Sequence, residues 1–482
     1  MNLPQVRITR LWQKLSPGML PFADAASVEL PLPRLLRLSL FQVSVGLASA
    51  LLVGTLNRVM IVELGVAAWL VSAMVALPLL AAPWRALVGF KSDTHRSALG
   101  WRRVPYLWFG SMLQFGGLAI MPFSLLVLSG DTHGPAWVGT VAAALAFVMV
   151  GAGLQTTQTA GLALATDLAP AHTRPRVVAL MYVMLLVGML LASVAFGWLL
   201  RDFSQIRLIQ VVQGAAVLTM VLNTVALWKQ EPRRREPLSD RAGTPFGEAW
   251  RAFAEQRKAK RFLVAVGLGT AAFQMQDIIL EPYGGTVLQL PIGATSLLTA
   301  MLAAGALSAF AWAARRLQQG VDPHRLAALG ALVGVFAFAA VIFAAPMQSS
   351  ALFRTGAFLI GFGGGLFAVC TLISAMDLAD PLRHPEAGPA AGLVLGAWGA
   401  VQAGAGGVAI GLGGALRDGV AALSSQGLLG PALEGPEVAY SVVYHIEIAL
   451  LFATLIAIGP MVRQQAAPPT LGRKLGLAEF PG

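Results

Sequence analysis

Residues 151–169, GAGLQTTQTAGLALATDLA, match residues 361–379, GFGGGLFAVCTLISAMDLA, and this match decides the fold. Each stretch begins with a Gly-x-Gly pair, continues through an apolar run and ends on Asp-Leu-Ala at the same spacing. A second match follows, because residues 197–202 and 413–418 both begin with glycine and end with an Arg-Asp pair. Most of the first half of the chain therefore recurs in the second half.

The composition indicates a membrane protein. Of the 482 residues, 56% are hydrophobic and only 12% are charged, which leaves more apolar surface than a soluble domain can cover. The apolar runs have about the 20 residues that a bilayer-spanning helix needs. We therefore predict an all-α polytopic protein with twelve transmembrane helices, six on each side of a polar centre. The predicted spans are residues 35–56, 66–90, 104–128, 137–165, 177–200, 207–228, 263–283, 292–314, 325–345, 351–376, 390–416 and 438–462.

The repeat predicts two six-helix bundles joined by a linker. The linker is rich in Pro, Arg and Glu, and its charge density excludes it from hydrocarbon. Parallel repeats of six spans build one large group of transporter folds, in which the substrate region lies near the bilayer midplane where the halves meet. The predicted parts are an N-terminal segment 1–34, a first bundle 35–228, the linker 229–261, a second bundle 262–462 and a tail 463–482.

The distribution of charge predicts the orientation. Most of the 34 Lys and Arg residues lie in the N-terminal segment, the loops after even-numbered spans and the C-terminal tail. Because such residues are retained on the cytoplasmic side, we expect both termini to be cytoplasmic, and the net charge of +11 needs no nucleic-acid partner. Cys370 is the only cysteine, and the six histidines form no metal-ligand spacing. No metal site is predicted, and no phosphate-binding loop or nucleophile elbow indicates an enzyme.

The loop between spans two and three resembles the signature loop of the major facilitator superfamily. It carries, in order, Gly89, Asp93 and the pair Arg102 and Arg103, although the stretch from Asp93 to Gly100 is longer than the family pattern. Arg85 precedes it near the end of span two, where we expect it to reach the membrane surface or to pin a neighbouring helix. We predict a structural or gating role for this loop.

Three further stretches resemble the PucC and LhaA family, namely residues 78–89, residues 101–106 and above all residues 276–285. The N-terminal residues 20–31 are more similar to the LhaA branch, which is associated with the core antenna ring. The resemblance implies a major-facilitator-like protein of phototrophic bacteria that delivers bacteriochlorophyll to light-harvesting antennae or assists their assembly. It also implies a location in the bacterial inner, or intracytoplasmic, membrane.

The resemblance implies partners and a cofactor as well. The expected partners are the light-harvesting α and β polypeptides of core LH1, or also of LH2, reaction centre–LH1 assembly intermediates, bacteriochlorophyll synthase and the membrane insertion machinery. The expected cofactor is transiently bound bacteriochlorophyll. The alternative left open is a proton-coupled transporter or exporter of a tetrapyrrole or another small molecule, because this architecture serves many substrates.

Polar residues inside spans are the candidate site, since each is unfavourable there unless it is paired or faces a cavity. Asp277 and Glu281 are spaced one helical turn apart in span seven, with Gln274 close by and a Pro-Tyr-Gly-Gly run at 282–285 expected to break the helix. Both carboxyls cannot remain ionised without a cation. They either close the bundle end as an ion-pair cluster, carry a coupling proton or ligate the magnesium of a chlorin. The cations expected on that side are Arg58 and Arg354.

His445 is the only histidine predicted well inside a span, and Glu447 lies two residues on, on a different face of the helix. A neutral imidazole suits the axial position of a tetrapyrrole magnesium. The alternative is a hydrogen bond to a neighbouring helix. The candidate pigment ligands are thus His445, Glu281, Asp277 and Gln274.

Overall fold

The computed structural model describes residues 25–27, 30–80, 101–128, 136–170, 173–231, 257–379, 391–430 and 433–462. All regular structure within these ranges is helical. In the described part of the chain, eleven helices are long and apolar enough to cross a membrane, and a further apolar helix, Ala68–Leu80, stands where span two is predicted. The predicted continuation of span two to residue 90 lies outside the described residues. The prediction of an all-helical, multi-pass membrane protein is confirmed.

The helices follow the predicted spans closely. Span one, Leu32–Glu63, comprises α2, α3 and two π-helical stretches. The elements of the first half are α2 (Leu32–Leu38), α3 (Leu40–Ser49), η3 (Ala50–Leu56), η4 (Val59–Glu63), α4 (Ala68–Leu80), α6 (Val104–Leu128), α7 (Ala136–Leu168), α8 (Arg174–Leu199) and α9 (Gln205–Leu227). Those of the second half are α11 (Arg257–Gln274), η5 (Met275–Ile278), α12 (Leu280–Thr286), α13 (Ile292–Gln318), α14 (Pro323–Ala344), α15 (Ser350–Ala379), α16 (Ala391–Ser425), α17 (Pro436–Ile458) and η8 (Gly459–Met461).

The repeated glycines make the same contacts in both halves. A Cβ added to Gly153 of α7 would lie 2.5 Å from the backbone nitrogen of Gln114 in α6. The matching Gly363 of α15 would place its Cβ 2.7 Å from the carbonyl oxygen of Gly330 in α14. Only glycine permits backbones to approach this closely, as is common between membrane helices. The sequence repeat is therefore a repeat of helix packing.

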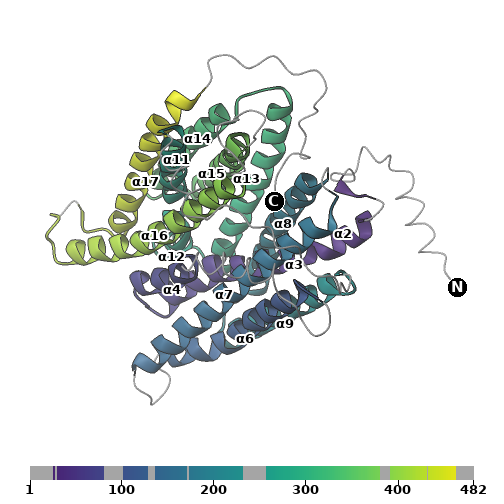
Figure 1. Ribbon diagram of the computed structural model, residues 1–482. Coiled ribbons are helices and arrows are strands. Elements are labelled where there is room, and N and C mark those ends of the chain that lie inside the picture. Colours follow the sequence, from purple (N-terminus) through teal and green to yellow (C-terminus); the bar gives the residue numbers. More distant parts are fainter. Residues whose placement is uncertain are drawn as a thin grey trace, which may run out of the picture.

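The two halves meet along two helix pairs, α8 with α13 and α4 with α16. Figure 1 shows α11, α13, α14, α15 and α17 grouped apart from α3, α6, α7, α8 and α9, with α16 beside α4. Gly197 of α8 and Gly293 of α13 bring the backbones together, because a Cβ on Gly293 would lie 2.4 Å from the Gly197 carbonyl oxygen. The Asp418 carboxylate accepts a 2.8 Å hydrogen bond from the backbone of Trp69 in the first turn of α4.

The first half is closed on itself by contacts between its two ends. The guanidinium of Arg34 donates to the side-chain and backbone oxygens of Gln230 at 3.0 and 2.6 Å. The next residue, Glu231, accepts hydrogen bonds from the backbone nitrogens of Arg102, Arg103 and Val104, at distances from 2.8 to 3.1 Å. A carboxylate at the first turn of α6 is favoured because the N–H groups there have no partner within the helix.

The expected position of the helix break in span seven is wrong. The α-helix is interrupted at η5, Met275–Ile278, before Pro282, and α12 continues through the proline. Pro282 lies in the first turn of α12, where the missing N–H would have had no helical acceptor. Consequently Asp277 and Glu281 belong to different helical segments and do not form a pair on one face.

Candidate functional site

The first candidate site is a buried polar cluster between the halves, which we define as Asn57, Gln276, Asp277, Glu281, Thr299 and Glu447. It is built from spans one, seven, eight and twelve. Glu281 is 2% exposed, and its Oε1 accepts a 2.6 Å hydrogen bond from Thr299. Gly54 leaves room for this carboxyl, because a Cβ there would lie 2.6 Å from Oε1. Among the described residues, Oε2 of Glu281 has no hydrogen-bond partner.

Asp277 connects the cluster to the first half of the protein. Its carboxylate accepts a 2.5 Å hydrogen bond from the Gln276 amide, and its backbone oxygen accepts one of 3.0 Å from Asn57. Asn57 also donates to the carbonyl oxygen of Val53 in its own helix. The amide oxygens of Asn57 and Gln276 are buried and accept no hydrogen bond within the described part of the chain. The cluster thus presents more acceptors than donors.

Four members of the cluster were not predicted as site residues, namely Asn57, Gln276, Thr299 and Glu447, and Glu447 is the acid among them. Its side chain is fully buried, and its carboxyl lies beside the backbone of Gln276 and within electrostatic range of Asp277. Neither oxygen accepts a hydrogen bond of ordinary geometry from a described residue. Because an acid inside a membrane span is by itself a candidate functional residue, the sequence did carry the signal for it.

The other residues predicted for this site lie outside the polar cluster. Arg58 forms a 2.5 Å ion pair with Glu63 and donates to the backbone oxygen of Leu290 at 3.2 Å. Arg354 is exposed on α15 and takes no part in the cluster. Gln274 lies against Gly406 of α16, so the glutamine beside Asp277 is Gln276 instead. The ion pair at this end joins two residues of span one, Arg58 and Glu63, and includes neither Asp277 nor Glu281.

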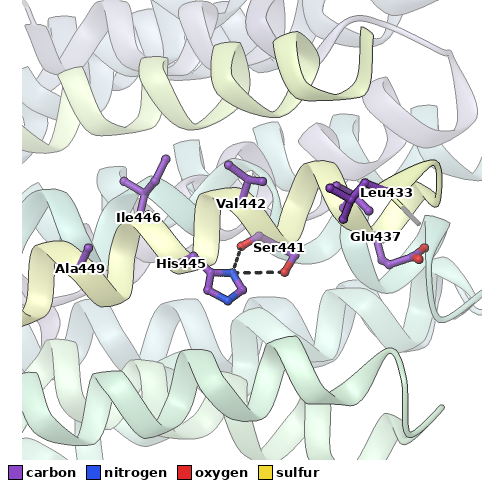
Figure 2. Close-up of a pocket in the computed structure, with 8 residues that line it drawn as sticks. Leu433, Glu437, Ser441, Val442, His445, Ile446 and Ala449 are labelled. Carbon is purple, nitrogen blue, oxygen red and sulfur yellow. Dashed lines mark hydrogen bonds between the residues drawn. The ribbon is translucent and has the colours of Figure 1, made fainter. Parts of the chain in front are cut away.

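The second candidate site is His445, in α17. The ring is exposed, and its Nδ1 lies 2.7 Å from the carbonyl oxygen of Ser441 and 3.3 Å from the Ser441 hydroxyl (Figure 2). A carbonyl oxygen only accepts, so this contact assigns the ring proton to Nδ1 and leaves the Nε2 lone pair free. Such a hydrogen bond on one ring nitrogen is what orients a histidine that binds a metal through the other.

His445 lines a groove of about 470 Å³ on the surface of α17. Its walls are largely apolar, and Figure 2 shows Val442, Ile446 and Ala449 along the same helix. The exposed Phe452 and Ile456 continue this face toward the other end of α17. Nine residues, roughly 14 Å of helix, separate His445 from the start of α17, and this is close to half the thickness of an about 30 Å hydrocarbon layer.

Two features of this groove could hold a flat apolar ligand that carries a metal. Nε2 of His445 is a nitrogen donor that could bind the metal, and the aliphatic side chains beside it offer apolar contact. The groove is open on one side, so a ligand could enter and leave within the membrane. Other packing faces of α17 are occupied by α11, α14 and α16.

The predicted loop after span two is described only in part. Arg85, Gly89 and Asp93 lie outside the described residues, whereas Arg102 and Arg103 are described. Arg103 Nε lies 3.1 Å, and Arg102 Nη2 3.5 Å, from a carboxylate oxygen of Asp167, the acid of the repeated motif. These arginines join α6 to α7 within one half, and their role in gating stays a prediction.

Comparison with known proteins identifies the family of this chain. A model of the family described as PUCC protein matches residues 55–466. The chain belongs to this family. The PucC-family protein is 56% identical over 426 residues to Protein PucC of Rhodovulum sulfidophilum, covering 87% of this chain and 92% of the relative.

Two further relatives extend the comparison. The chain is 55% identical over 479 residues to a protein of Rhodobacter capsulatus described as an uncharacterized protein in the puhA-bchM intergenic region, covering 98% of this chain and 99% of that one. It is 28% identical over 395 residues, covering 81% and 87% of the two chains, to a protein of Rhodobacter capsulatus named Bacteriochlorophyll synthase 44.5 kDa chain.

Solved structures confirm the fold of this PucC-family protein. The nucleoside transporter NupG superposes with a TM-score of 0.62 at 14% identity, covering 88% of this chain and 98% of NupG. A bacterial homologue of the iron transporter ferroportin gives 0.61 at 15% identity, covering 90% and 99%. At these identities the comparison shows the major-facilitator architecture alone.

Proposed function

We propose that this protein assists the assembly of photosynthetic light-harvesting antennae by holding bacteriochlorophyll in the groove of α17. The observation that carries the proposal is the exposed His445, which lines the groove and whose Nδ1 is hydrogen-bonded to the Ser441 carbonyl while Nε2 has no partner in the described part of the chain. The bound pigment would supply a magnesium ion, which Nε2 would hold. Membership of the PucC family and the relative named as a bacteriochlorophyll synthase chain support a pigment as the ligand.

The location of the groove supports handover inside the bilayer. A chlorin is poorly soluble in water, and an open groove on a membrane helix lets it remain in an apolar environment throughout. The proposed recipients are the α and β antenna polypeptides of core LH1, or also of LH2, in an inner membrane where both termini of the carrier are cytoplasmic. Assembly intermediates of the reaction centre and bacteriochlorophyll synthase are proposed as further partners.

The proposal is tested by purifying the full-length protein in a mild detergent from a host that makes bacteriochlorophyll. We expect a near-stoichiometric chlorin absorption band on the protein peak, together with antenna polypeptides detected by mass spectrometry. The same purification from a pigment-free mutant host is the control for detergent-solubilised pigment. Protein that carries neither chlorin nor antenna chains in the first host would overturn the proposal.

The second candidate function is proton-coupled transport of a tetrapyrrole, and the polar cluster is the observation that favours it. Glu281 and Glu447 are buried in the cluster, and no Lys or Arg of the described ranges forms an ion pair with either carboxyl. A carboxyl that holds a proton between the two halves is what a proton-coupled carrier requires. The cluster also fits a purely structural role, because Asn57 and Thr299 connect three spans through it.

Proton flux decides between the two functions. In proteoliposomes that contain a pH-sensitive dye, with bacteriochlorophyllide added as the probe, we expect no proton uptake above that of empty vesicles. Uptake that is present in the wild type and disappears in Glu281→Gln, while the exposed Arg354→Gln keeps it, would instead establish transport and place the proton on the cluster.

A further inference from the structure

A second groove lies on the opposite half of the molecule, between α8 and α9. These helices follow each other in the chain, yet they make few contacts with each other, because α8 packs against α13 and α3 whereas α9 packs against α6 and α3. The groove between them has a volume of about 770 Å³, and Val43 and Leu47 of α3 lie along it. Leu191 and Leu218 form apolar walls and are about half exposed, so the groove opens to the outside of the bundle.

The mouth of the groove is positively charged. Arg201, Asp202 and Arg207 line it where α8 ends and α9 begins, which is the level of a membrane surface. Arg207 pairs with the Asp202 carboxylate at 3.5 Å and donates to the Asp202 backbone oxygen at 2.9 Å. Arg201 is exposed and has no ion pair or hydrogen bond from its side chain within the described ranges. Two arginines therefore face one carboxylate.

The matching arginine of the second half has different partners. Arg417 matches Arg201 in the repeat, and it pairs with Asp418 at 2.7 Å. It also donates to the Tyr440 hydroxyl at 3.1 Å and lies 4.9 Å from the centre of that ring. Since Tyr440 belongs to α17, Arg417 bridges α16 and α17. In the first half, Arg201 makes no such bridge and α8 and α9 stay apart.

We propose that the groove between α8 and α9 binds one anionic phospholipid. Its phosphate would lie at Arg201 and Arg207, and its acyl chains would run between the helices over Gly214. The charge at the mouth selects an anionic headgroup, because each arginine at a membrane surface contributes about 1 kcal/mol to the binding of anionic lipid. Gly214 lies along the groove, and a Cβ added there meets no atom within 4 Å, so the groove is open at this point.

This lipid site is independent of the pigment site on α17 and does not rest on the proposed function. It would hold a lipid at the junction between α8, which packs against the second half, and α9, which does not. The anionic lipid would thus act as a structural partner of the first half, supplied by the surrounding leaflet.

Native mass spectrometry of the full-length protein tests the site. The protein is delipidated in detergent and then titrated with phosphatidylglycerol or with phosphatidylcholine. We expect the wild type to keep one phosphatidylglycerol preferentially. The variant Gly214→Phe, which fills the groove, should lose it, and Arg201→Gln should bind it roughly fivefold more weakly, the effect of one surface arginine. Gly399→Phe is the matched control, because Gly399 also has no atom within 4 Å of an added Cβ.

Each other outcome overturns the proposal. Equal retention of phosphatidylglycerol by the wild type and Gly214→Phe places the lipid elsewhere. Equal affinity for the two lipids, or no change in Arg201→Gln, shows that the arginines do not select the headgroup. A chlorin or a peptide that is bound by the wild type and lost in Gly214→Phe, in place of phospholipid, identifies a different occupant. Circular dichroism and elution volume check that the variants are folded.

Discussion

Replacing His445 with leucine is expected to remove the bound chlorin from the purified protein. Leucine keeps the apolar character of the groove but has no donor for magnesium. A metal site that loses a group supporting its ligand loses roughly 10- to 100-fold in affinity. Because His445 is proposed as the ligand itself, we expect the chlorin-to-protein absorbance ratio to fall by at least this factor. His445→Gln, whose amide oxygen is a weaker donor, should keep part of the pigment.

The matched control for this experiment is His324→Leu. His324 lies at the start of α14, where its ring is 3.3 Å from Asp322, and it does not line the groove. It should leave the bound chlorin unchanged. A His445→Leu protein that carries as much chlorin as the wild type would show that another residue binds the pigment, and the assignment of the α17 groove would fail.

Replacing Gly361 with alanine is expected to destabilise the protein more than the same replacement at any other glycine of the repeated motif. A Cβ there would lie 2.0 Å from the carbonyl oxygen of Leu302, so α15 and α13 must move apart along their contact. Overpacking of this kind typically lowers the free energy of unfolding by about 1–3 kcal/mol, and contact with rigid backbone favours the upper end. Denaturant titration of the detergent-solubilised protein measures the change.

Gly404→Ala is the control, because an added Cβ at Gly404 of α16 has no atom within 4 Å. Alanine is about 1 kcal/mol more favourable than glycine in a helix interior, so this variant should be as stable as the wild type or more stable. If Gly361→Ala unfolds at the same denaturant concentration as Gly404→Ala, the close packing of α15 on α13 does not contribute to stability.

The repeat in the sequence predicted the fold well, because the repeated glycines permit the same close helix packing in both halves. The bounds of α6 match the prediction at both ends. The prediction ended span eleven at residue 416, yet α16 continues to Ser425. The predicted end at residue 416 placed Arg417 and Asp418 just beyond the membrane span. They pair with each other instead, and Asp418 also binds the backbone of Trp69, so the helix continues through them.

The candidate sites were less predictable, because they depend on which face of a helix is covered. His445 and Glu447 are two residues apart, and the sequence indicated only that they point in different directions. The packing of α11, α14 and α16 on α17 decides that Glu447 is buried and His445 exposed. Likewise, the 3-10 turn at Met275–Ile278 separates Asp277 from Glu281, and no helix-breaking residue marks it in the sequence.

The closure of the first half at Gln230 and Glu231 has a consequence for biogenesis. Arg34 and the N-terminal turn of α6 find their partners in these two residues, so the hydrogen bonds that complete the first six helices all come from residues translated before α11. Because chains fold during synthesis from the N-terminus, we expect these contacts of the first bundle to form before the second bundle emerges. The later helices would then insert against helices that already hold one another.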